Sequence, residues 1–419
     1  MAFNINIHNQ GFWIKEFIMK KKTVLVLVCT ALLCGPLWAQ TAADFTYRLN
    51  STNDGVIITG YTGTATRVTI PAEIEGLPVR EIAPNAFRGI TSIPADRFTW
   101  GARTGNNPWT FRGTFETSIY TAVLTVTTRN HVSNSGPNAM AVGASGNLVV
   151  TYKITHVIIP EGVTIIGASA FAETRIALSA NLHYDTSISY SSTGALSSVT
   201  IPGTVTEIGE SAFENCQRLN ALTLPPSLRT LGRRAFANTA GLRTIVIPDG
   251  YTSLPREVFS GSGLTSITLP QTLLSIGHSA FSGCSSLASI TLPDSVLAIE
   301  DSAFANSGLT SFSWPAEMDF IPPGVFAGTR LRTLVIPDWV TEIGDGAFRS
   351  CRELTSVMLS PAIRTIHANA FGGCSALTTV TVPDSVTSIR FLGQGAFSGS
   401  SIGLVNQAAL NRLGYTGTF

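Results

Sequence analysis

A phrase of similar residues returns along most of this chain, and its constant period restricts the fold more than any other feature. Each copy ends in a phenylalanine, and from Phe213 to Phe397 these phenylalanines are 23, 23, 22, 23, 22, 22, 23 and 26 residues apart. One copy of this length cannot enclose its own apolar side chains, so neighbouring copies must cover them. The constant period therefore predicts a solenoid in which each copy forms one coil.

Each copy divides into a short strand and a return segment. In the copy LTSITLP, residues 264–270, apolar residues alternate with Ser266 and Thr268, as in a strand with one buried face. Pro270 ends the strand because it cannot donate a backbone hydrogen bond. Gly277 and Gly283 are placed to relieve the tight corners of the coil. The apolar residues of the return segment follow at near-helical spacing: Leu273, Ile276, Ala280 and Phe281.

The predicted fold class is a repeat solenoid with 22–23-residue coils, short parallel β-strands on one face and irregular or short helical turns on the other. Two degenerate copies end at Phe87 and Phe171, so two insertions interrupt the array. The predicted segments are an N-terminal cap with the first repeat (40–93), an aromatic-rich insertion (94–150), the solenoid (151–404) with a second insertion at 173–195, and a C-terminal cap (405–419).

The consensus L-x-x-[IV]-x-[LI]-P-x-x-[VL]-x-x-I-x-x-x-A-F-x-x-C-x-x-L resembles the leucine-rich repeat of BspA-like, treponemal-type bacterial surface proteins, over roughly residues 60–404. The stretch DGVIITGYTGTATRVTIPAEIEGLPVREIAPNAF, which ends at Phe87, is also similar to the N-terminal units of that family. The resemblance implies a leucine-rich repeat solenoid that serves as an exported, non-enzymatic binding or adhesion protein. Its implied partners are host matrix proteins or the surface proteins of other bacteria. It implies no catalytic residue, because the motif contains none.

The N-terminus has the composition of an export signal, predicted over residues 1–39. A basic stretch begins at Met19, a candidate for the true start, and the apolar run TVLVLVCTALL follows. Cleavage after Ala39 is predicted; lipoprotein processing at Cys34 is the alternative, which the large Leu33 disfavours. The apolar run is too short to span a bilayer comfortably. We therefore expect an exported protein, at the cell surface or secreted, with no transmembrane segment in the mature chain.

The charge of the chain argues against nucleic acid as a partner. Charged residues make up only 13% of the sequence, against about a quarter in typical proteins. Four of the five lysines precede residue 23, and the arginines are scattered. Without a basic stripe, the expected partners are proteins, with glycans as an alternative.

No group of residues in the sequence has the pattern of a catalytic or metal site. The G-x-S-x-G match at residues 399–403 falls in a connector of the repeat, where no strand-to-helix turn is predicted. The histidines of the mature chain show no metal-ligand spacing, so no metal or other cofactor is expected. The alternative is a scaffolded enzyme, or a glycan-binding module, with its site in the insertion at 94–150.

Four cysteines share one position in the repeat, three residues after the closing phenylalanine. All lie in the longer connectors, whereas the shorter connectors carry serine or threonine there. A small residue in a buried slot explains this distribution, so free thiols are predicted. Cys351 and Cys374 occupy adjacent coils, where a disulfide is the alternative. The four are Cys216, Cys284, Cys351 and Cys374.

Two surfaces are candidate binding sites. The first is the aromatic-rich insertion, because tryptophan and arginine are enriched at interface hot spots; a packed core of a small subdomain is the alternative. Its candidates are Trp100, Trp109, Phe111, Arg112 and Tyr120. The second is the outward strand face, a nearly uncharged ladder of hydroxyl residues that β-propensity alone also explains. Its candidates are Ser266, Thr268, Ser289, Thr291 and Thr333.

Two further segments depart from the repeat. The second insertion, residues 173–195, is polar and is expected to be a loop. At the C-terminus, three apolar residues are expected to face the last coil as a cap, which a solenoid needs at its end. These are Ala408, Leu410 and Leu413.

Overall fold

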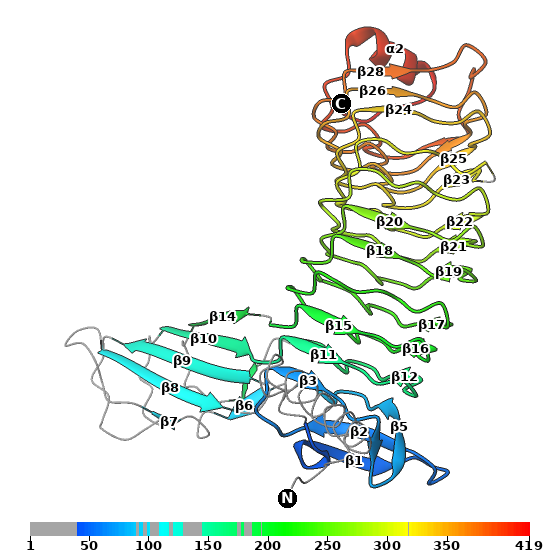
Figure 1. The fold of residues 1–419 in the computed structure, drawn as a ribbon. Coiled ribbons are helices and arrows are strands. Elements are labelled where there is room, and N and C mark those ends of the chain that lie inside the picture. Colours follow the sequence, from blue (N-terminus) through cyan, green and yellow to red (C-terminus); the bar gives the residue numbers. More distant parts are fainter. Residues whose placement is uncertain are drawn as a thin grey trace, which may run out of the picture. The chain divides into compact units, whose positions relative to one another are not determined.

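The structure is a computed structural model of the chain (Figure 1). The predicted export signal, with Met19, Cys34 and Ala39, lies outside the described residues. The described residues are 40–88, 92–94, 99–100, 109–116, 120–128, 145–173, 177–179, 187–193, 195–316 and 318–419.

The first segment of most coils is a three-residue strand that pairs in parallel with its counterpart in the next coil. His156, for example, is in register with Arg67 on one side and with Ser198 on the other. This confirms the predicted strand face and its one-coil register. The strands form three ladders: β3 (Arg67–Thr69), β11 (His156–Ile158) and β15 (Ser198–Thr200); β18 (Thr244–Val246) and β20 (Ser266–Thr268); and β24 (Thr333–Val335), β26 (Ser356–Met358) and β28 (Thr379–Thr381).

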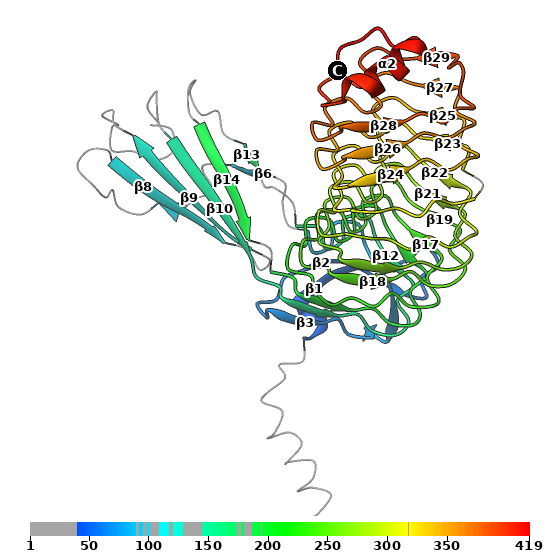
Figure 2. The ribbon, with the colours of Figure 1, turned by 90° about the horizontal axis from the view of Figure 1, so that it is seen from above.

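The return segment carries a second row of two-residue parallel strands rather than helical turns. Ile276, one of the residues at near-helical spacing, lies in the strand β21 (Ser275–Ile276), and Phe281 lies within the turn that follows. Figure 2 shows this row on the opposite side of the coils from β24, β26 and β28. Its strands are β12 (Ile165–Ile166), β16 (Glu207–Ile208), β17 (Thr230–Leu231), β19 (Ser253–Leu254), β21, β22 (Ala298–Ile299), β23 (Phe320–Ile321), β25 (Glu342–Ile343), β27 (Thr365–Ile366) and β29 (Phe391–Leu392).

The closing phenylalanines form a continuous stack through the core. Successive rings are nearly parallel, with centroids 5.0 Å apart at Phe87 and Phe171 and 5.8 Å apart at Phe304 and Phe326. Separations of this size allow offset stacking as well as burial of the ring faces. Phe281 is fully buried between its two neighbours in the stack. Each coil therefore supplies one ring that only the adjacent coils can cover.

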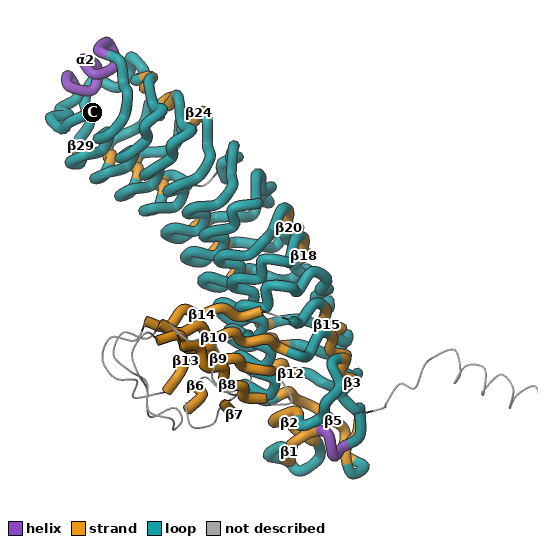
Figure 3. The backbone as a smooth tube through the Cα atoms, turned by 90° about the vertical axis from the view of Figure 1, so that its left-hand side faces the viewer, coloured by secondary structure: helices purple, strands orange, loops and turns teal. Residues whose placement is uncertain are grey.

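Two glycines show why the corners of a coil need this residue. A Cβ at Gly277 would lie 2.6 Å from the carbonyl oxygen of Leu254 in the preceding coil, closer than two such atoms can approach. Gly283 has a φ of 74°, in the left-handed region that glycine adopts without steric cost. Both observations confirm the predicted role of these glycines. Figure 3 shows that loops and turns make up most of each coil, with short strand segments repeating from one coil to the next.

The two insertions contribute to one five-stranded sheet. β14 (Ser187–Thr193) pairs in parallel with β10 (Ser145–Tyr152), so this part of the second insertion is a strand and not the loop that the sequence suggested. The sheet order is β14-β10-β9-β8-β7, with β7 (Thr99–Trp100), β8 (Trp109–Glu116) and β9 (Tyr120–Thr128). β6 (Ser92–Pro94) and β13 (Ala177–Ser179) form a separate parallel pair.

Both ends of the phenylalanine stack are covered by a tyrosine. At the N-terminal end, the ring of Tyr61 stacks on Phe87. At the C-terminal end, Tyr415 packs edge-on against Phe397, and its hydroxyl accepts a hydrogen bond from the Phe397 amide at 3.3 Å. Both tyrosines are buried, and each hydroxyl has a partner, since Tyr61 donates to the Ala65 carbonyl at 3.2 Å and Tyr415 to the Thr418 carbonyl at 2.7 Å.

The N-terminal cap is built from strands. β1 (Phe45–Leu49), which follows a 3-10 turn (Ala42–Asp44), pairs antiparallel with β2 (Val56–Tyr61). β2 then pairs in parallel with β5 (Leu77–Ile82), which also pairs antiparallel with β4 (Glu73–Ile74). β5 pairs in turn with β12 and so begins the second row of strands.

The C-terminal cap is the helix α2 (Leu404–Arg412), the one α-helix within the described residues. Leu410 is fully buried and Leu413 is largely buried, as predicted for a cap. Ala408 is exposed, so the prediction for that residue is wrong. It lies two residues before Leu410, and residues at this spacing on a helix point to different sides.

Replacing Phe281 by alanine is expected to lower the free energy of unfolding by about 3–5 kcal/mol, because truncation leaves a cavity between two buried rings. Equilibrium urea denaturation followed by circular dichroism measures this loss. The control is Phe320→Ala, whose ring is 37% exposed, and which should have a clearly smaller effect. Equal effects of the two substitutions would contradict a stabilising role of the stack.

Candidate binding surfaces

The strand face presents its outward residues to solvent as the alternation predicts. Ser266, Thr268 and Thr333 lie in strands whose central residue points toward the core. Ser289 and Thr291 are also exposed, although their coil has no regular strand at these residues. The five hydroxyl candidates therefore lie on one surface, and their part in binding stays a prediction.

Large apolar side chains interrupt the hydroxyl ladder. Val246 and Val335 are each 61% exposed, and Ile158 and Met358 are each close to half exposed. These residues occupy the same outward rank as Thr268, so the strand face combines hydroxyl groups with exposed apolar area. Such a mixture is typical of protein-binding surfaces, whose contact residues are apolar as well as polar.

The insertion sheet arranges most of its aromatic candidates on a single face. Trp100 is in register with Gly113, and Phe111 is two residues from Gly113 along β8. Residues two apart on a strand, and residues paired across strands, share a face. The same rule adds Trp109 and Tyr120 to this face and places Arg112 on the other. The sequence analysis assigned these five residues to one candidate site. The strand register instead places Arg112 on the opposite face of the sheet from the four aromatic residues.

One ion pair lies where the sheet strands β8 and β10 end. Lys153 donates to Glu116 at 2.6 Å, joining the residue after β10 to the last residue of β8. The hydrogen bond from Lys153, together with its charge, holds the pKa of Glu116 below its ordinary value. The Glu116 carboxylate is therefore charged at neutral pH and partly neutralised by its partner.

A buried glutamate joins the two ends of the second insertion. Glu173 is only 4% exposed, and its Oε1 accepts hydrogen bonds from the amides of Ala195 at 2.9 Å and Leu196 at 3.0 Å. Burial raises the pKa of Glu173 to about 7, against the opposing effect of these amides and of Arg218. The carboxyl group thus fixes the point where the chain re-enters the solenoid. The sequence analysis did not single out Glu173. The signal that could have found it is an acidic residue directly after the Ala-Phe-Ala that closes a coil, residues 170–172.

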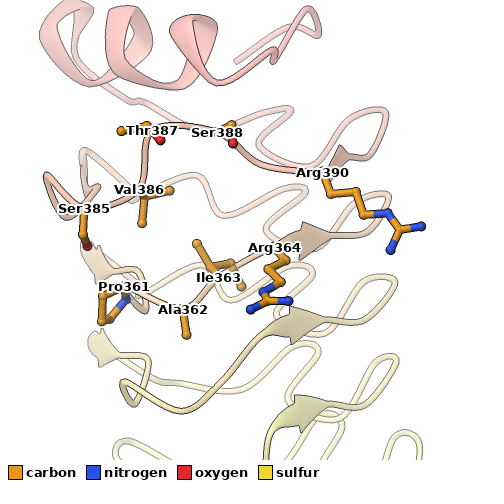
Figure 4. A pocket seen from close by; sticks show the side chains of 9 residues that line it. All are labelled: Pro361, Ala362, Ile363, Arg364, Ser385, Val386, Thr387, Ser388 and Arg390. Atoms are coloured by element: carbon orange, nitrogen blue, oxygen red, sulfur yellow. The ribbon is translucent and has the colours of Figure 1, made fainter.

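A recess near the last coil was also not predicted. It has a volume of about 410 Å³, and its lining includes Arg364, Ser385, Ser388 and Arg390. Figure 4 shows that the two arginines extend from adjacent coils. The 26-residue step before Phe397 was the sequence signal of an enlarged coil. Positive charge and hydroxyl groups give this recess the chemistry of an anion site.

The cysteines fill the slot that their spacing predicted. Within the described residues all four thiols are free and buried, so the disulfide alternative for Cys351 and Cys374 is not realised. The Cys284 thiol donates to the carbonyl of Phe259 in the preceding coil at 3.1 Å. In a shorter connector, Thr329 instead donates to the carbonyl of Phe326 of its own coil at 2.8 Å. Burial raises the pKa of Cys284 to about 11, which makes the thiol unreactive.

The described residues contain no group of three or more histidine, cysteine or acidic side chains that could hold a metal ion. His367 instead lies 2.7 Å from the Glu342 carboxylate in an exposed pair. Ser401, the serine of the G-x-S-x-G match, donates to the carbonyl of Ser375 at 2.9 Å, and no strand leads into it. Across the same part of the chain, no helix is long and apolar enough to cross a membrane.

The coil geometry agrees with a family assignment. The BspA type leucine rich repeat region matches residues 149–265, 252–358 and 319–408, in six copies, and so covers more than half of the chain. The chain belongs to the BspA type leucine-rich repeat family. Proteins of this repeat family are typically surface or binding proteins and are generally non-enzymatic scaffolds. No curated protein matches the chain.

Among the solved structures similar to this protein are two leucine-rich repeat proteins of other bacteria. A leucine-rich repeat protein from Bacteroides ovatus is 23% identical, over 85% of this chain and 79% of that one, with a TM-score of 0.54. A leucine rich cell surface protein from Faecalibacterium prausnitzii is 22% identical, over 88% of this chain and 99% of that one, with a TM-score of 0.38. The first is a likeness of fold, and it agrees with the solenoid described above.

The four thiols are expected to react very slowly with a disulfide reagent at pH 8 in the folded protein and rapidly in denaturant. Burial excludes the reagent, and a pKa of about 11 leaves roughly one Cys284 thiol in a thousand as thiolate. Ser289→Cys, on the exposed strand face, should add one thiol that reacts at once. Release of fewer than four thiols from the denatured mature chain would instead reveal a disulfide.

Thermal stability is expected to depend on pH through Glu173. The folded protein keeps its proton up to a pKa of about 7, whereas the unfolded chain releases it near 4.5, so the free energy of unfolding falls as pH rises between these values. Glu173→Gln keeps the acceptor for both amides and should remove about 1–3 kcal/mol of this pH dependence. Melting temperatures from pH 5 to pH 8 measure it.

The matched control for this experiment is Glu161→Gln, at an exposed position of the preceding turn. It should leave the pH dependence of melting unchanged. An identical pH profile for the wild type and the Glu173 variant would show that this carboxyl does not titrate with a raised pKa.

Proposed function

We propose that this chain is an exported, non-enzymatic binding or adhesion protein, at the cell surface or secreted, that engages host matrix proteins or proteins on other cells. One observation carries the proposal: the repeat builds a long scaffold whose exposed strand face is nearly uncharged and mixes hydroxyl with apolar side chains. Surfaces of this composition bury area on a protein partner without a large desolvation penalty for charge. The family assignment and the basic, apolar N-terminus support it.

The insertion sheet is the proposed centre of affinity. Trp100, Trp109, Phe111 and Tyr120 share one face by register, and large aromatic residues contribute most of the free energy at protein interfaces. Serine and threonine on the strand face contribute less individually, because their truncation removes little buried area. The sheet therefore supplies strong contacts, and the coils supply area and position.

Binding is tested with the mature chain and a panel of purified extracellular-matrix proteins by surface plasmon resonance. Alanine at each of the four aromatic positions is expected to weaken binding by about tenfold or more. Thr110→Ala and Thr114→Ala, on the opposite face of β8, are the controls. Arg112→Ala tests whether that opposite face contributes, and the melting temperature of each variant reports whether the sheet remains folded.

Two results would count against the proposal. Unchanged affinity in folded aromatic variants would move the site to the strand face, where alanine at Thr268, Thr291 and Thr333 is the next test. Unprocessed protein in the cytoplasm, found by cell fractionation, would contradict export.

A further inference from the structure

The coil that contains residues 311–314 has an unusual strand segment, which borders a recess of about 480 Å³. The strand ladder is interrupted between β20 and β24, and residues 311–313 form no regular strand. Here Phe312 and Trp314 take the places that Ile290 and Leu292 hold one coil earlier. The recess is lined by these two rings and by Val335, Asp338 and Trp339, among others.

The floor of the recess is fixed by the phenylalanine stack. Trp314 packs edge-on against Phe326 with ring centroids 5.6 Å apart, and Phe312 does so at 4.6 Å. The two floor rings also pack edge-on against each other at 5.2 Å. Rings held by several aromatic contacts lose little further freedom when a ligand binds, so the recess is preformed.

Trp339 forms the wall of the recess and breaks a bonded pattern. In four other coils the residue at this position has a hydroxyl that donates to a carbonyl of the preceding coil at 2.7–2.8 Å, and in two more the position holds Gly250 or Ala362; the four hydroxyl residues are Thr204, Ser227, Thr272 and Ser295. Trp339 has no hydroxyl and makes no such hydrogen bond in the structure, and its side chain is 44% exposed. Trp339 exposes apolar area and adds no hydrogen bond to the preceding coil, so stability of the coil does not explain this residue.

The charge of the recess indicates the kind of ligand. Asp338 is the one ionisable side chain in its lining. Arg330 and Arg332 flank the lining residue Leu331 but do not line the recess, and Arg332 is 3.3 Å from Glu353 in an exposed ion pair. The faces of aromatic rings carry partial negative charge, which adds to that of the carboxylate. Both features attract a cation.

We propose that this recess binds an arginine side chain of a protein partner, with the guanidinium stacked on the indole rings and paired with Asp338. Arginine fits better than lysine because its planar group stacks on rings and pairs with a carboxylate through two parallel hydrogen bonds. This inference rests on the proposed protein-binding function, but it does not depend on the insertion sheet.

The test uses the mature chain labelled with 5-fluorotryptophan and a capped Gly-Gly-Arg-Gly-Gly peptide as the probe. Fluorine NMR titration is expected to shift the Trp314 and Trp339 signals, with a dissociation constant of about 1 mM or tighter. The same peptide with citrulline, which keeps the shape and removes the charge, should bind at least about tenfold more weakly. The lysine peptide should fall between the two.

Two variants locate the site. Trp339→Ser, which installs the residue that two other coils hold at this position as Ser227 and Ser295, should abolish the response, and Asp338→Asn should weaken it by about tenfold. Asp294→Asn, at the equivalent exposed position of another coil, should bind as the wild type does.

Equal binding of the arginine and citrulline peptides would overturn the inference, as would no response at up to about 10 mM peptide. A response to neutral oligosaccharides but not to the arginine peptide would replace it with a glycan site. Because the probe is a peptide, failure here leaves the matrix-protein experiment unaffected, and failure of that experiment leaves a positive peptide result standing.

Discussion

The need of each coil to bury its apolar face against the next coil is the constraint on which this structure depends. A single coil has one phenylalanine, a few aliphatic residues and two very short strands, which cannot form a core alone. Stacking satisfies the strand hydrogen bonds and covers both faces of each ring at once. Rings such as Phe281 are fully buried for this reason, although a single coil could not cover both faces of its own ring.

The same constraint explains how the chain tolerates two long insertions. Phe87 stacks directly on Phe171, and Phe171 on Phe213, although the residues between them far exceed one period. Because the stack is continuous across both interruptions, the insertions leave and re-enter at the edge of a coil without disturbing the core. Glu173 marks the second of these points, where a buried carboxyl binds the amides of the returning chain.

Function in such a scaffold is found where a coil departs from its pattern. The repeated positions are occupied by residues that stacking requires, so they say little about ligands. Trp339 stands where four other coils place a bonded hydroxyl, and the long last coil opens a recess beside Arg364 and Arg390. At each departure the regular contacts between coils are replaced by exposed aromatic or charged side chains.

The sequence by itself determined the coil length, the strand register, the buried cysteine slot and the corner glycines. These follow from periodicity, because a residue that recurs every 22 or 23 positions must face the same neighbours in every coil. Only the tertiary structure decided what lies outside the period. It assigned β14 to the sheet of the first insertion, separated Arg112 from the aromatic face, left Ala408 exposed and brought Trp314 beside Trp339. Contacts of this kind depend on which segments meet in space, and no repeating pattern records them.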